Sequence, residues 1–335
     1  MIIRLVNQDD DADVATWLDV VAAARRHDEA EPATWPHREW TLTLRDAERP
    51  VRITTYLAEE DGVAVGTGVL EFTLRDNPTL SDINIQVLPE HRRRGIGTAL
   101  FERLRADSLA TGRTCAITFV DVPLKADASP GSHFAIRHGL TVRIREAHQV
   151  LRLPIATAHL EQLIAGTEAR SRAYRFELWT GPCPEQWAEE YAGLLGGLST
   201  EAPSGDTQFE ADCYDVDRLR ASERLAARQG RQVFNAVAVA PDGTLAGHTQ
   251  LLVPDADLDP DRAYQAGTLV WPAHRGHQLG LALKARIHLA AQQQLPELHR
   301  MVHTWNAEQN SWMIAVNEAL GYRRSSVEFC LQGDL

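Results

Sequence analysis

The sequence predicts a mixed α+β fold that occurs twice along the chain. Its 335 residues suit two domains better than one, because a usual domain has roughly 100–200 residues. Three short motifs also recur in the same order, at spacings of 181 to 183 residues. They are residues 87–92 with 270–275, 61–62 with 242–243, and 138–140 with 320–322. Strand and helix patterns alternate around them, which predicts helices covering a mixed sheet.

In the first copy, alternating apolar residues predict strands, and apolar residues at helical spacing predict helices. The expected strands are residues 2–6, 51–58, 63–74, 82–88, 115–120 and 141–153. Asp61-Gly62 between two of them is a hairpin signal, because such pairs tolerate the positive φ that tight turns require. Helices are expected after a candidate N-cap at Asp13, over residues 96–104, and before Gly139.

The second copy shows the same order of elements. Strands are expected at residues 174–179, 233–240, 244–253, 266–270 and 300–304, and helices at 187–198, 279–287 and 312–320. Pro154 opens a stretch that separates the two patterns. We therefore expect domains at residues 1–153 and 173–335, joined by a linker at 154–172.

Composition excludes several classes of protein. The formal charge of −12 argues against general binding of nucleic acids and suits a cationic small substrate. No apolar run approaches the ~20 residues that span a bilayer, so no membrane association is expected. The start of the chain lacks the apolar core of a secretory signal, which favours a cytoplasmic location. The four cysteines form no CxxC pair, and arginine supplies every basic residue except two, a bias typical of GC-rich bacterial genomes.

The centre of each copy is a strand, a short Arg/Gly turn and a helix. In the first copy the turn is Arg92-Arg93-Arg94-Gly95-Ile96-Gly97. The first turn of a helix leaves backbone N–H groups without partners, and the helix dipole adds positive charge there. Glycines let a phosphate approach the backbone, and arginines add charged donors. The turn therefore predicts a pyrophosphate site, although its arginines could also form a solvated face and its glycines could serve helix packing.

The turn of the second copy departs from this pattern. It reads His274-Arg275-Gly276-His277-Gln278-Leu279-Gly280, so Gln278 replaces the first glycine. His274 and His277 lie three residues apart without a third ligand nearby, so we expect no metal. The first turn matches neither of the nucleotide motifs GxxxxGK[ST] and GxGxxG.

A strand, the motif Pro-x-x-Arg-x-x-Gly-x-Gly, a helix, a strand and a helix that ends in glycine together resemble the GNAT superfamily of N-acetyltransferases. The signature of that family is Q/R-x-x-G-x-G/A, and the resemblance covers most of both copies. The tandem arrangement resembles mycothiol synthase and related two-domain actinobacterial acetyltransferases. The resemblance implies that acetyl-CoA is the co-substrate, with its pyrophosphate on the turn at residues 92–97.

The resemblance also implies which residues contact acetyl-CoA. In the first copy they are Val87, Leu88, Arg92, Arg93, Arg94, Gly95, Ile96 and Gly97. In the second copy they are Val270, His274, Arg275, Gly276, His277, Gln278, Leu279, Gly280, Asn306 and Asn310, of which Asn310 could also cap a helix. The family's tyrosine that protonates the thiolate is missing, because Asn317 and Ala135 stand at the matching positions.

Acetyl transfer to an amine needs a polarised carbonyl and a group that removes a proton. In the family a backbone N–H near the strand end polarises the carbonyl, here at residues 87–88 or 270–271. The candidate bases are Glu71 and Asp82 in the first copy, and Glu201 and His248 in the second. Each of them could equally be an ordinary strand or loop residue.

We therefore expect an acyltransferase that moves an acetyl group from acetyl-CoA to an amine of a small-molecule acceptor, by direct attack on the thioester. By analogy with mycothiol synthase, the C-terminal copy is expected to be catalytic and the N-terminal copy to hold CoA structurally. A non-catalytic CoA-binding or scaffold protein is an alternative, and so is a transferase with a different acyl donor. The sequence leaves the acceptor and the oligomeric state open.

Overall fold

The computed structural model describes residues 1–34, 36–203, 205–211 and 213–335, and it divides into two compact units. Unit 1 contains Met1–Glu146, Gly205–Gln208 and Ser325–Leu335. Unit 2 contains the described residues of 147–204 and 209–324. This division differs from the expected one, because the last strand of the chain belongs to the first unit.

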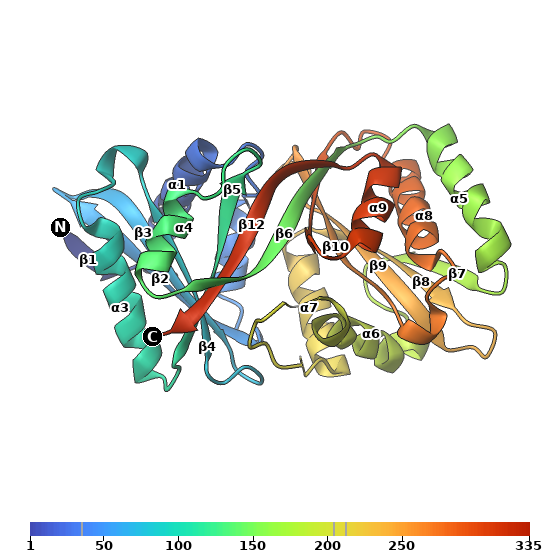
Figure 1. Ribbon diagram of the computed structural model, residues 1–335, viewed down its shortest axis with the longest axis horizontal. Coiled ribbons are helices and arrows are strands. Elements are labelled where there is room, and N and C mark those ends of the chain that lie inside the picture. Colours follow the sequence, from blue (N-terminus) through green and yellow to red (C-terminus); the bar gives the residue numbers. More distant parts are fainter. Residues whose placement is uncertain (35, 204, 212) are drawn as a thin grey trace. The chain divides into compact units, whose positions relative to one another are not determined.

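Unit 1 is built on a mixed sheet with the strand order β1-β2-β3-β4-β5-β12-β6. The strands are β1 (Ile2–Leu5), β2 (Val51–Glu60), β3 (Val63–Thr73), β4 (Leu80–Val87), β5 (Cys115–Pro123), β12 (Arg323–Asp334) and the part of β6 (Thr141–Arg152) up to residue 146. Asp61 and Gly62 both have positive φ between β2 and β3, which confirms the predicted hairpin. The sequence patterns do not predict β12, which pairs antiparallel with β5 (Figure 1).

Helices cover both faces of this sheet. They are α1 (Asp11–Asp28), α2 (His37–Leu44), α3 (Ile96–Ala110) and α4 (Pro130–Arg137). One apolar cluster joins α1 and α2 to Val69, and another joins α3 and α4 to Leu70. Because neighbouring strand residues point to opposite faces, the two clusters lie on opposite sides of the sheet. The N-cap of α1 is Asp10 rather than the predicted Asp13, whose carboxylate pairs with Arg4 at 2.7 Å.

Unit 2 repeats this plan with the strand order β6-β11-β10-β9-β8-β7. The strands are β7 (Arg175–Thr180), β8 (Gln232–Val239), β9 (Leu245–Val253), β10 (Arg262–Val270), β11 (Met301–Ala307) and the rest of β6. The helices are α5 (Thr157–Ser171), α6 (Ala188–Glu201), α7 (Val216–Arg228), α8 (Leu279–Gln294) and α9 (Ser311–Leu320). Most of the expected linker at 154–172 is α5, whose Leu160 joins the same apolar core as Leu283 of α8. None of the described helices has the length and apolar character that crossing a membrane requires.

Each unit contains two parallel strands that separate along their length. β4 and β5 pair only where Leu80–Asp82 faces Cys115–Ile117. β10 and β11 pair only where Arg262–Tyr264 faces Met301–His303. Beyond these pairs, no ladder pairing joins the facing edges of the two strands within the described part of the chain. Both units therefore offer a gap between strands, directly before the Arg/Gly turn.

Candidate active site

The gap in unit 1 opens into a pocket of about 910 Å³. This volume lies at the upper end of the roughly 300–1,000 Å³ that is usual for ligand sites. The pocket is lined by β4, residues 91–93 and 95–98, β5, α4, the end of α1, and Glu328 of β12. All of these segments belong to unit 1, including the one from the far end of the chain.

The predicted pyrophosphate turn forms one wall of this pocket. A short 3-10 helix at Pro89–His91 leads into it, and Arg93 and Gly95 take left-handed conformations with φ of 63° and 86°. α3 then begins at Ile96, so the N–H groups of its first turn point out of the helix without helical partners. A Cβ at Gly97 would lie 3.3 Å from the ring of Phe134, which explains the second glycine by packing.

The three arginines of the turn have different partners. Arg92 donates from Nε to the Val87 carbonyl at 2.9 Å and from both terminal nitrogens to Asp28 at 2.8 and 2.7 Å. Arg92 therefore fixes the turn to the end of β4 and to α1, instead of offering its fork to a phosphate. Arg94 pairs with Glu60 at 3.0 Å. Among the described residues, Arg93 has no ion-pair partner, and it lines the pocket.

Strand pairing selects the backbone N–H that can polarise a carbonyl. Leu88 donates its N–H to Val65 on β3 at 3.0 Å, so this group is not available to a ligand. Because hydrogen-bonded and non-hydrogen-bonded positions alternate along an antiparallel pair, the N–H of Val87 points the other way, into the gap. Unit 2 shows the same arrangement, with Trp271 bonded to Ala246 and Val270 left facing the gap.

The turn of unit 2 has positive φ at the same two positions as the turn of unit 1, but its glycine stands at the first of them and not at the second. Gly276 and Gln278 have positive φ of 85° and 58°, where unit 1 has Arg93 and Gly95. Arg275 donates to the Val270 carbonyl and to Glu201 at 2.7 Å, as Arg92 does to its own strand end and helix end.

The two histidines of this turn bind protein groups. His274 lies 3.1 Å from the Tyr174 hydroxyl, and His277 lies 3.2 Å from the Arg170 carbonyl. Within the described residues, no group of three or more potential ligands is arranged for a metal ion.

Of the two asparagines predicted to contact acetyl-CoA in unit 2, Asn310 is bound by the protein and, among the described residues, the amide nitrogen of Asn306 is not. The Asn310 side chain accepts the N–H of Met313 and so caps α9. Lys284 is 1% exposed and donates to Asn317 at 2.6 Å, and Asn317 donates to Gln149 at 2.8 Å. The amide nitrogen of Asn306 is buried without a hydrogen-bond partner among the described residues.

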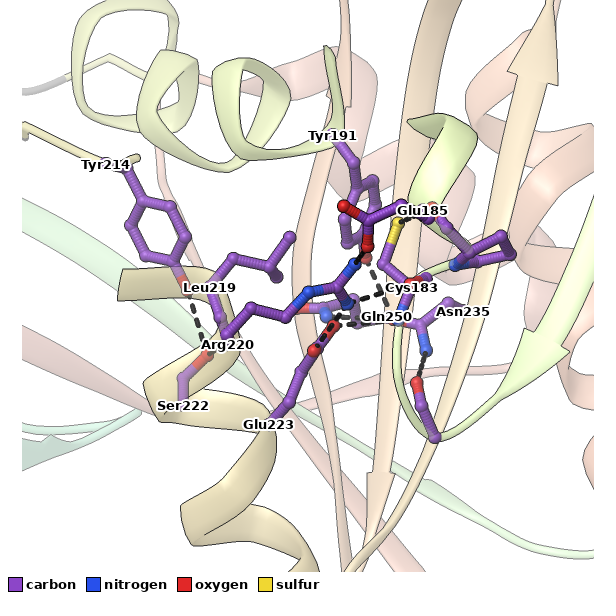
Figure 2. A network of polar contacts seen from close by, with 12 residues as sticks. Cys183, Glu185, Tyr191, Tyr214, Leu219, Arg220, Ser222, Glu223, Asn235 and Gln250 are labelled. Atoms are coloured by element: carbon purple, nitrogen blue, oxygen red, sulfur yellow. Dashed lines mark hydrogen bonds and ion pairs between the residues drawn. The ribbon is translucent and has the colours of Figure 1, made fainter. Parts of the chain in front are cut away.

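A second polar network in unit 2 joins α6, α7 and β8 (Figure 2). Arg220 pairs with Glu223 and Glu185 at 2.8 and 2.7 Å, and Glu223 accepts the Cys183 N–H. Tyr191 and Gln250 both donate to the Asn235 side chain. Figure 2 shows that these groups point toward one another, so the guanidinium of Arg220 lies between two carboxylates of the same unit.

The predicted bases of unit 1 lie outside the pocket. Glu71 and Asp82 face each other across β3 and β4, and neither lines the pocket. Burial, and then the charge of Glu71, raise the pKa of Asp82 to about 8. One Asp82 oxygen is buried and lacks a hydrogen-bond partner within the described residues.

The predicted bases of unit 2 are also placed unfavourably. Glu201 accepts the guanidinium of Arg275 and thereby fixes the turn. His248 is fully buried beside Tyr191, Val237 and Leu269 of an apolar cluster. Burial lowers the pKa of His248 to about 3, so the imidazole is neutral near pH 7.

Sequence reasoning misses the acidic side of the unit 1 pocket. Asp28 and Glu29 at the end of α1, Asp121 of β5 and Glu328 of β12 all line it. Burial raises the pKa of Glu328 to about 8, and the charges of Glu146, Asp121 and Glu29 add to the rise while Arg25 opposes it. No local pattern connects residue 328 with a pocket made by the first 140 residues.

Comparisons with known proteins agree with the repeated architecture. Residues 20–127 match the model of the acetyltransferase (GNAT) family. None of the curated proteins compared with the sequence matches it. The chain is similar to a tandem GNAT protein from the clavulanic acid biosynthesis pathway, with 25% identity, a TM-score of 0.78, and coverage of 99% of this chain and 98% of that one.

Two further structures have the same fold at lower identity. A GCN5-related N-acetyltransferase from Sphaerobacter thermophilus is 13% identical, with a TM-score of 0.67 and coverage of 99% of this chain and 95% of that one. An acetyltransferase described as putative from Pyrococcus horikoshii is 14% identical, with a TM-score of 0.58 and coverage of 100% and 89%. The resemblance to mycothiol synthase stays a prediction.

Proposed function

Because the whole chain has the fold of a tandem GNAT protein, we propose that it transfers an acetyl group from acetyl-CoA to an amine of a small molecule, and that unit 1 is the active unit. The observation that carries this proposal is the pocket of unit 1, which joins the start of α3 to the open edge of β4. The residues that match the family model also lie in unit 1. This choice departs from the expectation that the C-terminal copy is catalytic.

The pocket residues suit each part of acetyl-CoA. The free N–H groups at the first turn of α3 suit the pyrophosphate, and Arg93 and Arg137 add positive charge along the wall. Ile85 and Phe134 provide an apolar surface for the pantetheine arm. The N–H of Val87 faces the gap between the strands, where a thioester carbonyl would lie.

The chain supplies positioning and electrostatics for the reaction. Acetyl-CoA would bring the acetyl group as a thioester, whose thiol is a good leaving group and needs no dedicated acid. The N–H of Val87 is held in place because β4 pairs with β3 on its other edge. A fixed N–H of this kind stabilises negative charge that develops on the carbonyl oxygen.

Unit 2 gives weaker support for a second active site. Its turn places Gln278 where unit 1 has Gly95, and its helix α8 carries Lys284 at the position of Phe101, which lines the unit 1 pocket. Lys284 is held by Asn317 inside the protein. We therefore propose that unit 2 is a non-catalytic copy.

Three glycine variants test the proposal. Gly95, Gly62 and Gly276 all have φ between 79° and 86° and open space where a Cβ would lie, so each Gly→Asp change imposes similar backbone strain. We expect Gly95→Asp to weaken acetyl-CoA binding by about 100-fold or more, because a carboxylate would face the pyrophosphate. Gly62→Asp in the distant hairpin and Gly276→Asp in unit 2 should bind as the wild type does, by calorimetry.

The outcomes separate the alternatives. Loss of binding in Gly276→Asp alone would place the acetyl-CoA site in unit 2 instead. Release of CoA with an amine panel, measured on the wild type, distinguishes a transferase from a protein that only binds CoA.

A further inference from the structure

We propose that the acceptor side of the unit 1 pocket binds a protonated primary amine whose other groups carry no negative charge, and that Glu328 of β12 removes its proton. This inference rests on the proposed function of unit 1, because it assigns the second substrate of the same pocket. It gives a catalytic role to a residue of the last strand, in a site otherwise built by the first 140 residues.

Two of the four carboxylates that line the pocket are compensated by arginine. Asp28 accepts both terminal nitrogens of Arg92 at 2.8 and 2.7 Å. Glu29 accepts a hydrogen bond from Nε of Arg25 at 2.6 Å. These two pairs hold the end of α1 against the pocket. Because each carboxylate is paired with an arginine, neither is available to bind a cationic ligand.

The other two carboxylates have no ion-pair partner among the described residues and stand directly opposite each other. Asp121 of β5 and Glu328 of β12 are cross-strand partners. Such partners have Cβ atoms roughly 4.5–5.5 Å apart, and like charges there are destabilising. Asp121 accepts a hydrogen bond from Ser326, whereas Glu328 has neither a hydrogen-bond nor an ion-pair partner within the described part of the chain.

Both carboxyls lie on the α1 side of the sheet. The neighbours of Glu328 along β12, Val327 and Phe329, pack into the α3–α4 cluster, so Glu328 points to the opposite face. Val120 and Val122 place Asp121 on that face by the same argument. The groups around Glu328 are Glu146 of β6, Arg25 and Glu29 of α1, and Asp121 of β5. This set is negative overall, so a bound cation would relieve the repulsion.

The chemistry of transfer follows from this placement. The Glu328 carboxylate takes one proton from the ammonium group and leaves a neutral amine. The nitrogen lone pair attacks the thioester carbon, and a C–N bond forms as the C–S bond breaks. The thiolate leaves with the bonding electrons and takes up the second proton lost by the nitrogen. The products are an amide, CoA and the proton held by Glu328, which returns to solvent.

The charge of the wall also predicts which amines are accepted. A carboxylate on the acceptor would face Asp121 and Glu328 in a site of reduced dielectric constant, where like charges repel strongly. We expect kcat/KM for 1,4-diaminobutane to exceed that for 4-aminobutanoate by about tenfold or more. Butylamine, which has no second charge, should fall between them.

The test uses the full chain and two matched variants. Glu328→Gln keeps the shape of the side chain and removes its basicity, whereas Asp334→Asn changes an exposed carboxylate on the same strand outside the pocket. We expect Glu328→Gln to lower kcat/KM for the diamine about 100-fold or more at pH 8, a usual contribution of a general base. It should also lose a rise in rate near pH 8 that the wild type shows. Asp334→Asn should match the wild type, and Glu328→Asp should recover part of the activity.

Calorimetry with acetyl-CoA separates the two levels of the proposal. If the wild type does not bind acetyl-CoA in unit 1, the proposed function fails and this inference falls with it. If acetyl-CoA binds but Glu328→Gln acetylates the diamine at the wild-type rate, the role of Glu328 is wrong. If 4-aminobutanoate is accepted as well as the diamine, or none of the three amines is acetylated, the acceptor class is wrong. Unchanged acetyl-CoA affinity in Glu328→Gln shows that the variant is folded.

Discussion

Units 1 and 2 share one backbone plan and differ in how their polar groups are satisfied. In both, an arginine joins the turn to the end of a strand and to a carboxylate at the end of a helix. In unit 1 the turn opens into a pocket lined by Glu328, which has no ion-pair partner among the described residues. In unit 2, Lys284 and Asn317 bind each other, and Arg220 is neutralised by two glutamates. The comparison teaches that the backbone shape of the turn does not depend on whether the polar groups beside it bind each other or line a pocket.

The largest expected difference between the units is that their stability against unfolding changes with pH in opposite directions. Burial raises the pKa of Asp82 and of Glu328 in unit 1 to about 8. Because the folded unit holds protons that the unfolded chain releases, unit 1 should lose stability as the pH rises from about 4 to about 8. Burial lowers the pKa of His248 and His288 in unit 2 to about 3 and that of Lys284 to about 7. Unit 2 should therefore lose stability as the pH falls.

Hydrogen exchange of peptides from α3 and α8, corrected for intrinsic rates, measures both responses in one sample. When the pH falls from 8 to 5, we expect the unfolding free energy of unit 1 to rise by on the order of 1–3 kcal/mol. The unfolding free energy of unit 2 should fall by a similar amount. Glu328→Gln should reduce the response of unit 1 and leave that of unit 2 unchanged, and the part that remains in unit 1 is due to Asp82. Slopes of the same sign in both units would contradict this assignment of buried acids and bases.

Substitutions of two neighbouring arginines in the first turn should have different effects: one should lower the stability of unit 1 and the other should weaken acetyl-CoA binding. Arg92→Ala removes the bonds to Val87 and Asp28, and we expect unit 1 to lose about 1–2 kcal/mol of unfolding free energy. Arg93→Ala should leave stability within about 0.5 kcal/mol and weaken acetyl-CoA binding about tenfold. Denaturant titration and calorimetry check the pair. Equal effects of the two variants on binding would restore the sequence-based view of Arg92 as a phosphate ligand.

The smallest expected effect concerns the moved glycine of the second turn. Gln278 has a φ of 58°, a conformation that costs a residue with a Cβ roughly 1–2 kcal/mol. Gln278→Gly relieves that cost but makes the unfolded chain more flexible, so we expect unit 2 to gain about 0.5 kcal/mol. Gly276→Ala should instead lower the stability of unit 2, because it places a Cβ at a positive φ. A loss of stability in Gln278→Gly would show that the glutamine side chain itself stabilises the turn.

Local patterns predict much of this fold because they depend on near neighbours. The hairpin at Asp61-Gly62, the strand before each turn, and α9 ending at Gly321 all follow from spacing and from the conformations that glycine tolerates. Helices α2, α5 and α7 are not predicted. The sequence around α5 begins with Pro154, which we interpret as the start of a linker, although Leu160 is buried in the core of unit 2.

The candidate site is predicted only where it is local in sequence. Most residues of the first turn line the pocket, whereas Glu71, Asp82, Glu201 and His248 do not, and binding of a pyrophosphate by the turn stays a prediction. Both Asp121 and Glu328 stand in ordinary strand patterns, and only the pairing of β5 with β12 brings them together. No periodicity within one segment can reveal a contact between residues 207 positions apart.

The position of β12 has a consequence for biosynthesis. β5 can complete its antiparallel ladder only after the ribosome has made the whole of unit 2 and then residues 325–335. At about 5–20 residues per second, the nascent first half waits roughly 10–40 s with one sheet edge bare. A bare edge of this kind invites pairing with other chains. The half that is synthesised first is therefore the half whose sheet edge stays exposed longest during synthesis.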